Sequence, residues 1–229
     1  MLRAVIFDID GTLYDYAAAH ARAFRALSDY ACDAYGLTGD RFRTLYDRAD
    51  ALLKARAGAS SAVHNRLIRC QLMLEALGRP IGDAPALASL YWSTLLQWLK
   101  PFPGLREAFD RLKAMGVRIG IGTNMTADWQ YAKLNALKIM DLVDFMVTSE
   151  EAGAEKPDRR LFDLCAEKAG CAPSECAFVG DSIAGDVAGA LRAGMLAVWF
   201  DPAGKPEPPP EGARRIASLS EVPELIASL

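Results

Sequence analysis

The sequence predicts an α/β fold in which a parallel sheet is covered by helices and interrupted by an all-helical insertion. The first observation is a short apolar run, Leu2 to Phe7, that ends in acidic and glycine residues. The second is the region after Gly104, where short apolar runs alternate with helix-like segments, as in a parallel sheet with helices on its faces. The third is the region between residues 16 and 99, which shows helical periodicity and no strand pattern.

The elements expected from these patterns follow the chain in order. After a strand at 2–7, four helices fill the insertion, with breaks near 36–39, 58–61 and 78–82 and a stop at the prolines 101 and 103. Helices are then expected at 103–115, 126–137, 158–169 and 184–193, and strands at 117–122, 145–148, 177–179 and 197–200. The proline-rich segment 202–210 predicts a surface loop before a last short helix. The expected domains are an α/β core of residues 1–15 and 100–229 and a helical domain of residues 16–99.

Composition bounds the class of protein. The chain has 229 residues, of which 52% are apolar, enough to bury a substantial core. Its net charge of -3 gives no broad basic field, so nucleic acid and anionic membranes are not expected as partners. No apolar run approaches the roughly 18 residues of a membrane span, and the N-terminal stretch lacks the cleavage site of a signal peptide. We therefore expect a cytoplasmic protein, and the sequence does not indicate its oligomeric state.

The cysteines bound the chemistry further. There are five of them, at positions 32, 70, 165, 171 and 176, and they contain no C-x-x-C pair. An odd number with this spacing argues against a zinc site and against a disulfide framework. We expect reduced, mostly buried thiols.

Acidic residues at the ends of two expected strands carry the functional signal. Asp8 and Asp10 follow the first strand at two-residue spacing, so their side chains point the same way. Asp181 follows the strand at 177–179, and Asp186 lies a short distance further along the chain. Two carboxylates ~4 Å apart repel by roughly 4 kcal/mol at the effective dielectric of a protein surface. A cation or a shared proton is therefore required, and the acids of both strands should converge at the carboxyl edge of the sheet.

These acids belong to an ordered set of four motifs. The motifs are Asp8-Ile9-Asp10-Gly11-Thr12, Thr123-Asn124, Lys156-Pro157, and Gly180-Asp181-Ser182 with Asp186. In this order, each at a strand end or just before a helix, they resemble the haloacid dehalogenase (HAD) superfamily of phosphotransferases, in the subfamily with a helical cap. The resemblance implies a Rossmann-like core, a cap formed by residues 16–99, and metal coordination by the main-chain carbonyl of Asp10. It also implies that Asp186 either binds the metal directly or supports a metal-bound water.

The acidic residues fit phosphate chemistry. A carboxylate can attack phosphorus if a cation withdraws charge from the phosphoryl group and holds it in line, which makes Asp8 the expected nucleophile. Asp10 is suited to protonate the leaving oxygen and then to deprotonate the hydrolytic water. Asp181 adds a hard oxygen ligand to a site that suits Mg²⁺. With the roles that the resemblance implies for Asp10 and Asp186, the expected metal residues are Asp8, Asp10, Asp181 and Asp186.

The two remaining motifs supply groups that would hold a dianionic phosphate. Thr123 and Asn124 lie where a strand ends and a helix begins, so hydroxyl, amide and main-chain N–H groups can face it. Lys156 supplies positive charge to a site that three acids, a metal ion and a phosphate would otherwise leave too negative. We expect Asp8, Asp10 and Lys156 to be catalytic, and Thr123 and Asn124 to bind substrate.

The expected activity is Mg²⁺-dependent hydrolysis of a small phosphorylated metabolite through an aspartyl-phosphate intermediate. Asp10 disfavours a dehalogenase, because family members that cleave carbon-halogen bonds have no use for an acid at that position. The stretch 121–162 is loosely similar to nucleoside-monophosphate phosphatases of the superfamily, so the expected substrate is a nucleoside monophosphate or a sugar phosphate. Substrate selection is expected in the cap and its hinges, with candidates Tyr14, Tyr16, His20, Arg56, Arg66 and Arg69.

Two alternative functions stay open. His20 resembles a cap histidine of hexose-phosphate mutases, although a polar helix residue between alanines is the simpler interpretation. Thr12 also departs from the valine usual in those mutases. The second alternative is a catalytically silent binding protein, against which the intact acids, Lys156 and Thr123 argue together.

Overall fold

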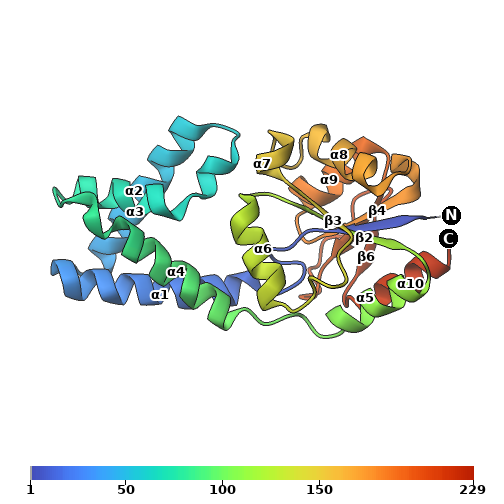
Figure 1. Ribbon diagram of the computed structural model, residues 1–229, viewed down its shortest axis with the longest axis horizontal. Helices are drawn as coiled ribbons and strands as arrows, with labels where there is room; N and C mark the ends of the chain where they lie inside the picture. The colour runs from blue at the N-terminus through green and yellow to red at the C-terminus, as the bar shows by residue number, and fades with distance from the viewer. Residues whose placement is uncertain (1) are drawn as a thin grey trace. The chain divides into compact units, whose positions relative to one another are not determined.

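The computed structural model describes residues 2–229, which divide into two compact units (Figure 1). The α/β unit joins the segment that ends at Asp15 to Lys100–Leu229. The helical unit is Tyr16–Leu99.

The α/β unit is built on a parallel sheet of six strands in the described residues, in the order β3-β2-β1-β4-β5-β6. The strands are β1 (Ala4–Phe7), β2 (Arg118–Thr123), β3 (Phe145–Thr148), β4 (Cys176–Gly180), β5 (Leu196–Phe200) and β6 (Arg214–Ile216). β1 lies at the centre, where Phe7 is in register with Ile121 of β2 and with Val179 of β4. The predicted fold class is confirmed.

Helices cover both faces of this sheet (Figure 1). They are α5 (Leu105–Ala114), α6 (Ala127–Ala136), α7 (Ser149–Ala152), α8 (Arg159–Ala169), α9 (Ala188–Ala193) and α10 (Glu221–Ala227). Phe109 of α5 packs on Phe7 with ring centroids 4.7 Å apart, and Phe162 of α8 packs on Phe178 at 4.8 Å. Because Phe7 and Phe178 point to opposite faces of neighbouring strands, these two contacts anchor the two helical layers.

Three elements differ from the sequence expectation, and one of them is the short helix α7, where no element is expected. The helix expected at 184–193 begins instead with a π-helical turn, Ile183–Val187, and only then continues as α9. The Ser182 side chain accepts a hydrogen bond from the Gly185 amide, and the Asp186 carboxylate accepts one from the Ser182 amide. Such local bonds compete with regular helical pairing. Strand β6 was not expected, because its three residues contain two arginines and no apolar run.

The helical unit contains α1 (Tyr16–Tyr35), α2 (Gly39–Ala57), α3 (Arg66–Ala76) and α4 (Ala84–Trp98). The buried positions of α1 recur at helical spacing and are mostly alanine: Ala19, Ala23, Leu27 and Ala31. Thr38 and Asn65 cap the starts of α2 and α3 by accepting main-chain hydrogen bonds. Among the described helices, none is long and apolar enough to cross a membrane.

Candidate active site

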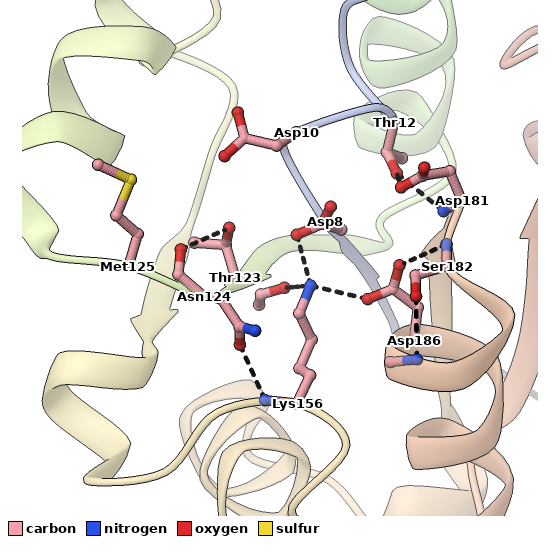
Figure 2. A network of polar contacts seen from close by, with 12 residues as sticks. Asp8, Asp10, Thr12, Thr123, Asn124, Met125, Lys156, Asp181, Ser182 and Asp186 are labelled. Carbon is pink, nitrogen blue, oxygen red and sulfur yellow. Dashed lines mark hydrogen bonds and ion pairs between the residues drawn. The ribbon is translucent and has the colours of Figure 1, made fainter. Parts of the chain in front are cut away.

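Three neighbouring strands bring functional side chains to one edge of the sheet. Asp8 follows β1, Thr123 ends β2, and Asp181 follows β4. Because these strands are adjacent and parallel, their carboxyl ends meet at the edge where open α/β sheets bind ligands. Figure 2 shows the side chains from these strand ends gathered around Lys156.

Asp8, Asp181 and Asp186 form a tight group of carboxylates. Each offers an oxygen that lies within 4.8 Å of the oxygens from the other two. Asp8 and Asp186 are buried, with 5% and 1% of their surface exposed. A Cβ added at Gly180 would lie 2.3 Å from the Asp186 carboxyl carbon, so glycine at this position makes room for the carboxylate.

Lys156 is the cation inside this group. Its Nζ lies 2.5 Å from Oδ1 of Asp8 and 2.7 Å from Oδ1 of Asp186, and its side chain is buried. Its main-chain N–H donates a 2.8 Å hydrogen bond to Oδ1 of Asn124. The two predicted motifs that hold Asn124 and Lys156 are thus joined directly.

The charges of the acid group are only partly balanced. Burial raises the pKa of Asp8 to about 7, and the neighbouring carboxylates of Asp186 and Asp10 raise it while Lys156 lowers it. Burial and Asp186 also raise the pKa of Asp181 to about 6. Burial alone would lower the pKa of Lys156, but Asp186 and Asp8 raise it above its ordinary value. One ammonium group therefore does not offset three carboxylates, and the group as it stands favours an additional positive charge.

This donor set could hold a metal ion. Three convergent carboxylates offer hard oxygen ligands, which Mg²⁺ prefers. The crowded carboxylates and the raised pKa values of Asp8 and Asp181 both fit a divalent cation.

Asp10 lies apart from the carboxylate group. Nζ of Lys133, from α6, lies 2.8 and 2.6 Å from the two oxygens of Asp10, and the hydroxyl of Tyr14 donates to Oδ1 of the same carboxylate. Burial would raise the pKa of Asp10, but Lys133, Tyr14 and Gln130 together bring it below its ordinary value. Of the four residues predicted to hold metal, the structure therefore groups the carboxylates of three. For Asp10 the resemblance implicates the main-chain carbonyl.

Thr123 and Asn124 are held by a residue that the sequence analysis did not name. Nε2 of Gln130 donates to Oγ1 of Thr123 at 2.8 Å and to the Asn124 carbonyl at 2.7 Å. Gln130 and Lys133 lie three residues apart on α6 and are both buried. This spacing, which places two polar side chains on one face of an expected helix, is the signal that could have identified them.

Asp181 is fixed by two further residues outside the predicted set. Its N–H donates to Oγ1 of Thr12 at 3.1 Å, and its carbonyl accepts from the indole of Trp199 at 3.2 Å. The first bond holds the loop after β4 against the loop after β1, and the second holds it against β5. The fourth motif thus depends on the threonine of the first.

Comparison with known proteins gives the class and the family to which this fold and site belong. Residues 2–194 match the model of the haloacid dehalogenase-like hydrolases, and the chain belongs to this family. A 2-haloacid dehalogenase structure from Pseudomonas syringae pv. Tomato DC3000 superimposes with a TM-score of 0.79 at 28% identity, covering 100% of this chain and 99% of that one. An HAD phosphatase structure from Thermococcus onnurineus gives 0.75 at 25% identity, covering 98% of each.

Curated relatives place the chain among the phosphatases of this family. A ribulose-1,5-bisphosphate 5-phosphatase from Halopiger xanaduensis is 37% identical, over 88% of this chain and 86% of the relative. A glyceraldehyde 3-phosphate phosphatase from Methanothermobacter thermautotrophicus is 33% identical, over 86% and 85% respectively. The chain is an HAD-type phosphatase, and the resemblance stated from its motifs is confirmed.

Proposed function

We propose that the protein hydrolyses a small sugar phosphate through a covalent phosphate ester on Asp8. The observation that carries the proposal is the buried group of Asp8, Asp181, Asp186 and Lys156 at the carboxyl edge of the sheet. The helical unit would act as the cap of the family, covering the site while the substrate reacts.

In the proposed first step, an oxygen of Asp8 attacks phosphorus and the bond to the leaving oxygen breaks. Asp10 donates a proton to that oxygen, which leaves as an alcohol. Mg²⁺ held by Asp8, Asp181 and Asp186 would neutralise phosphoryl charge. Lys156 positions Asp8, and Thr123 and Asn124 bind the phosphate oxygens.

In the proposed second step, water attacks phosphorus and inorganic phosphate leaves, which restores Asp8. Asp10, now ionised, takes the proton of that water. The contact of Asp10 with Lys133 favours the ionised form, which suits this step. The first step requires the protonated form, so we propose that the contact loosens when substrate binds.

The substrate class rests on the relatives. Three relatives that cover most of the chain are named for phosphorylated sugars: ribulose bisphosphate, glyceraldehyde 3-phosphate and, from Rattus norvegicus at 27% identity, N-acylneuraminate 9-phosphate. A pyrimidine 5'-nucleotidase from Escherichia coli, 31% identical, matches over only 55% of this chain. A sugar phosphate is therefore the better supported of the two substrates expected from the sequence.

The helical unit supports the simpler interpretation of His20. Its Nδ1 lies 2.7 Å from the Tyr91 hydroxyl, and its ring stacks on Tyr16. Burial, together with Arg66, Arg69 and Arg43, lowers the pKa of His20 to about 4. These contacts suit a neutral packing residue better than the histidine of a mutase. The expected cytoplasmic location and the absence of a nucleic-acid partner stay predictions from the sequence.

The test is a screen of the purified protein against sugar phosphates, triose phosphates and nucleoside monophosphates, with release of inorganic phosphate as the readout. We expect release from a sugar phosphate in Mg²⁺ and none after EDTA treatment, with recovery when Mg²⁺ is restored. Isomerisation without release would indicate a mutase, and inertness toward every substrate would support a silent binding protein. Full activity after thorough EDTA treatment would refute the metal assignment.

The nucleophile is tested by Asp8→Asn, with Asp163→Asn as the matched control. Asp163 is an exposed acid of α8 whose partner is Arg159 in the same helix. We expect Asp8→Asn to remove turnover of p-nitrophenyl phosphate while the circular dichroism spectrum is kept. The control should behave as the parent protein. Substantial residual turnover in Asp8→Asn would eliminate Asp8 as the nucleophile.

A further inference from the structure

The helical unit contains a cavity of its own, of about 500 Å³, between α1, α2 and α3. This volume falls in the range of small-molecule sites. Every residue that lines the cavity belongs to Tyr16–Leu99, so it is a feature of this unit alone.

Arg66 is a buried cation in the wall of this cavity. It is 8% exposed, and within the described helical unit, Tyr16–Leu99, no carboxylate lies within ion-pair distance of it. Its guanidinium donates weakly to the hydroxyls of Tyr91 and Tyr16 at 3.3 and 3.4 Å, and to the His64 carbonyl at 3.4 Å. Burying a charge without a counter-ion is costly, and these long bonds to neutral oxygens offset only part of that cost.

Three buried donors of the cavity wall have no hydrogen-bond partner within residues 2–229. They are Nε of Arg66, Nε of Arg69 and the hydroxyl of Tyr46. Arg69 and Tyr46 are 6% and 4% exposed, so neither donor is in bulk water. Unpartnered buried donors are rare in folded proteins, and three in one wall indicate an acceptor that the protein itself does not supply.

The charges of the wall agree with this interpretation. The ionised side chains of the wall are Arg43, Lys54, Arg66, Arg69, Asp47 and Asp50. Asp50 is already paired, at 2.8 Å with Lys54 and at 2.5 Å with Arg69. The lowered pKa of His20, which also lines the cavity, reflects burial first and then the fields of Arg66, Arg69 and Arg43.

We propose that this cavity binds the oxyanion of a small metabolite, a phosphate or a carboxylate, with Arg66 as its principal ligand and Arg69 and Tyr46 as further donors. A guanidinium fork matches both groups in two-point geometry. The aromatic rings of Tyr16 and Phe24 in the same wall suit an organic body attached to the anion. The donors of this cavity require an anion, whereas the acid group of the α/β unit requires a cation.

The binding test uses the full chain in EDTA, with inorganic phosphate and malonate as separate probes. The Nε–H resonances of arginine are followed in ¹⁵N-labelled protein, because they locate the anion at a particular guanidinium. We expect a saturable shift of the Arg66 resonance with at least one probe. In Arg66→Met the dissociation constant should rise at least about tenfold, which corresponds to ~1.4 kcal/mol.

Arg79→Met is the matched control, because Arg79 is an exposed arginine of the same unit outside the cavity wall. It should bind both probes as the parent chain does. If Arg66→Met fails to fold, Arg43→Met and Lys54→Met replace it, since both side chains are exposed and line the cavity. Each should weaken binding by about two- to fivefold. No shift of the Arg66 resonance with either probe, or unchanged affinity in these variants, would overturn the proposal.

Kinetic measurements distinguish two sources of the anion in the cavity: a separate small molecule, or a second anionic group on the substrate. These measurements rest on the proposed function. If the substrate supplies the anion, Arg66→Met should raise the KM for a sugar bisphosphate at least about tenfold and leave the KM for p-nitrophenyl phosphate unchanged. If both KM values are unchanged while the Arg66 resonance still responds to phosphate, the anion is a separate ligand. Failure of the phosphatase activity itself would leave the binding result intact.

Discussion

The two units of the chain hold opposite imbalances of charge. In the α/β unit, the three carboxylates of Asp8, Asp181 and Asp186 gather beside the ammonium group of Lys156, which pairs with the first and the last of them. In the helical unit, Arg66 and Arg69 share a cavity wall in which Asp50 is the paired acid. An unbalanced buried charge destabilises the folded chain, so each imbalance indicates the sign of the charge on the ligand that binds there. We therefore expect the α/β unit to bind a cation and a phosphate, and the helical unit to bind an anion.

In the comparison of the two units, the largest expected effect comes from removing the ammonium group of Lys156 from the acid group. Lys156→Met leaves Asp8 and Asp186 without their shared partner, so phosphate release should fall roughly 10²- to 10³-fold. Mg²⁺ should raise the Tm of this variant more than that of the parent protein, because the acids then rely on the metal ion alone. Activity assays and thermal unfolding with and without Mg²⁺ measure both effects.

Lys113→Met is the control for that variant, since Lys113 pairs with Asp144 at the surface of the same unit. It should change neither phosphate release nor the response to Mg²⁺. If Mg²⁺ does not change the Tm of Lys156→Met, the acid group of the α/β unit does not require a cation, and the contrast between the two units fails.

A single methyl group tests how tightly the acid group is packed. In Gly180→Ala the new Cβ would lie 2.3 Å from the Asp186 carboxyl, so the carboxylate must move. We expect a loss of about 1–3 kcal/mol in the free energy of unfolding and a roughly tenfold or greater fall in phosphate release. Gly39→Ala in the helical unit has nothing within 4 Å of the new Cβ and should be neutral in both measurements. Equal behaviour of the two variants would contradict the packing argument.

Lys133→Met removes the cation that holds Asp10. The Lys133 side chain is 1% exposed and that of Asp10 is 26% exposed, so the pair is partly screened by solvent. We expect a loss of about 1–3 kcal/mol in unfolding free energy and a fall of about tenfold in phosphate release. Tyr14→Phe, which removes only a hydroxyl from the same carboxylate, should have a smaller effect. Denaturant titrations and kcat values in which Tyr14→Phe equals or exceeds Lys133→Met would show that Lys133 is not the main support of Asp10.

The smallest expected effect is on the pH dependence of stability, through His20 and the arginines around it. The pKa of His20 is about 4 in the folded protein and 6.5 ordinarily, so between these values the unfolded chain binds more protons. Stability should therefore fall as the pH drops from 6.5 toward 4. His20→Gln should reduce that fall by roughly 1–2 kcal/mol, after a discount for solvent screening. Urea titrations of both proteins at about pH 7 and about pH 4.5 measure the difference, and parallel pH dependences would exclude a role for His20.

The acid group could be anticipated from the sequence because the place of each acid after its own strand is set by local sequence. Asp8 and Asp181 each follow a short apolar strand, and parallel strands deliver their ends to one edge. The convergence of Asp8 with Asp181 and Asp186 follows from the pairing of β1 with β4. Lys156 reaches the same edge from the segment between α7 and α8, which follows β3. Lys133 could not be predicted because helical spacing identifies a face of α6 but not the residues that this face contacts.

The helical unit was harder to interpret for the same reason. Arg66 was a candidate from the sequence but could not be separated from Arg56, an exposed arginine of α2. Burial of a helical arginine depends on how four helices pack, and periodicity does not contain that information. Strand β6 could not be predicted because a short edge strand forms through its pairing with β5, and its own residues carry no strand pattern.

The indole of Trp199 has a consequence for experiment. It donates to the main chain of Asp181, whereas Trp92 lies in the other unit with the Arg66 guanidinium 6.0 Å from its ring centre. Because indole emission responds to the electric field around the ring, the chain carries one optical reporter near each proposed ligand. With the other two of its four tryptophans replaced, stopped-flow fluorescence could time the arrival of metal ion and anion separately in a single molecule.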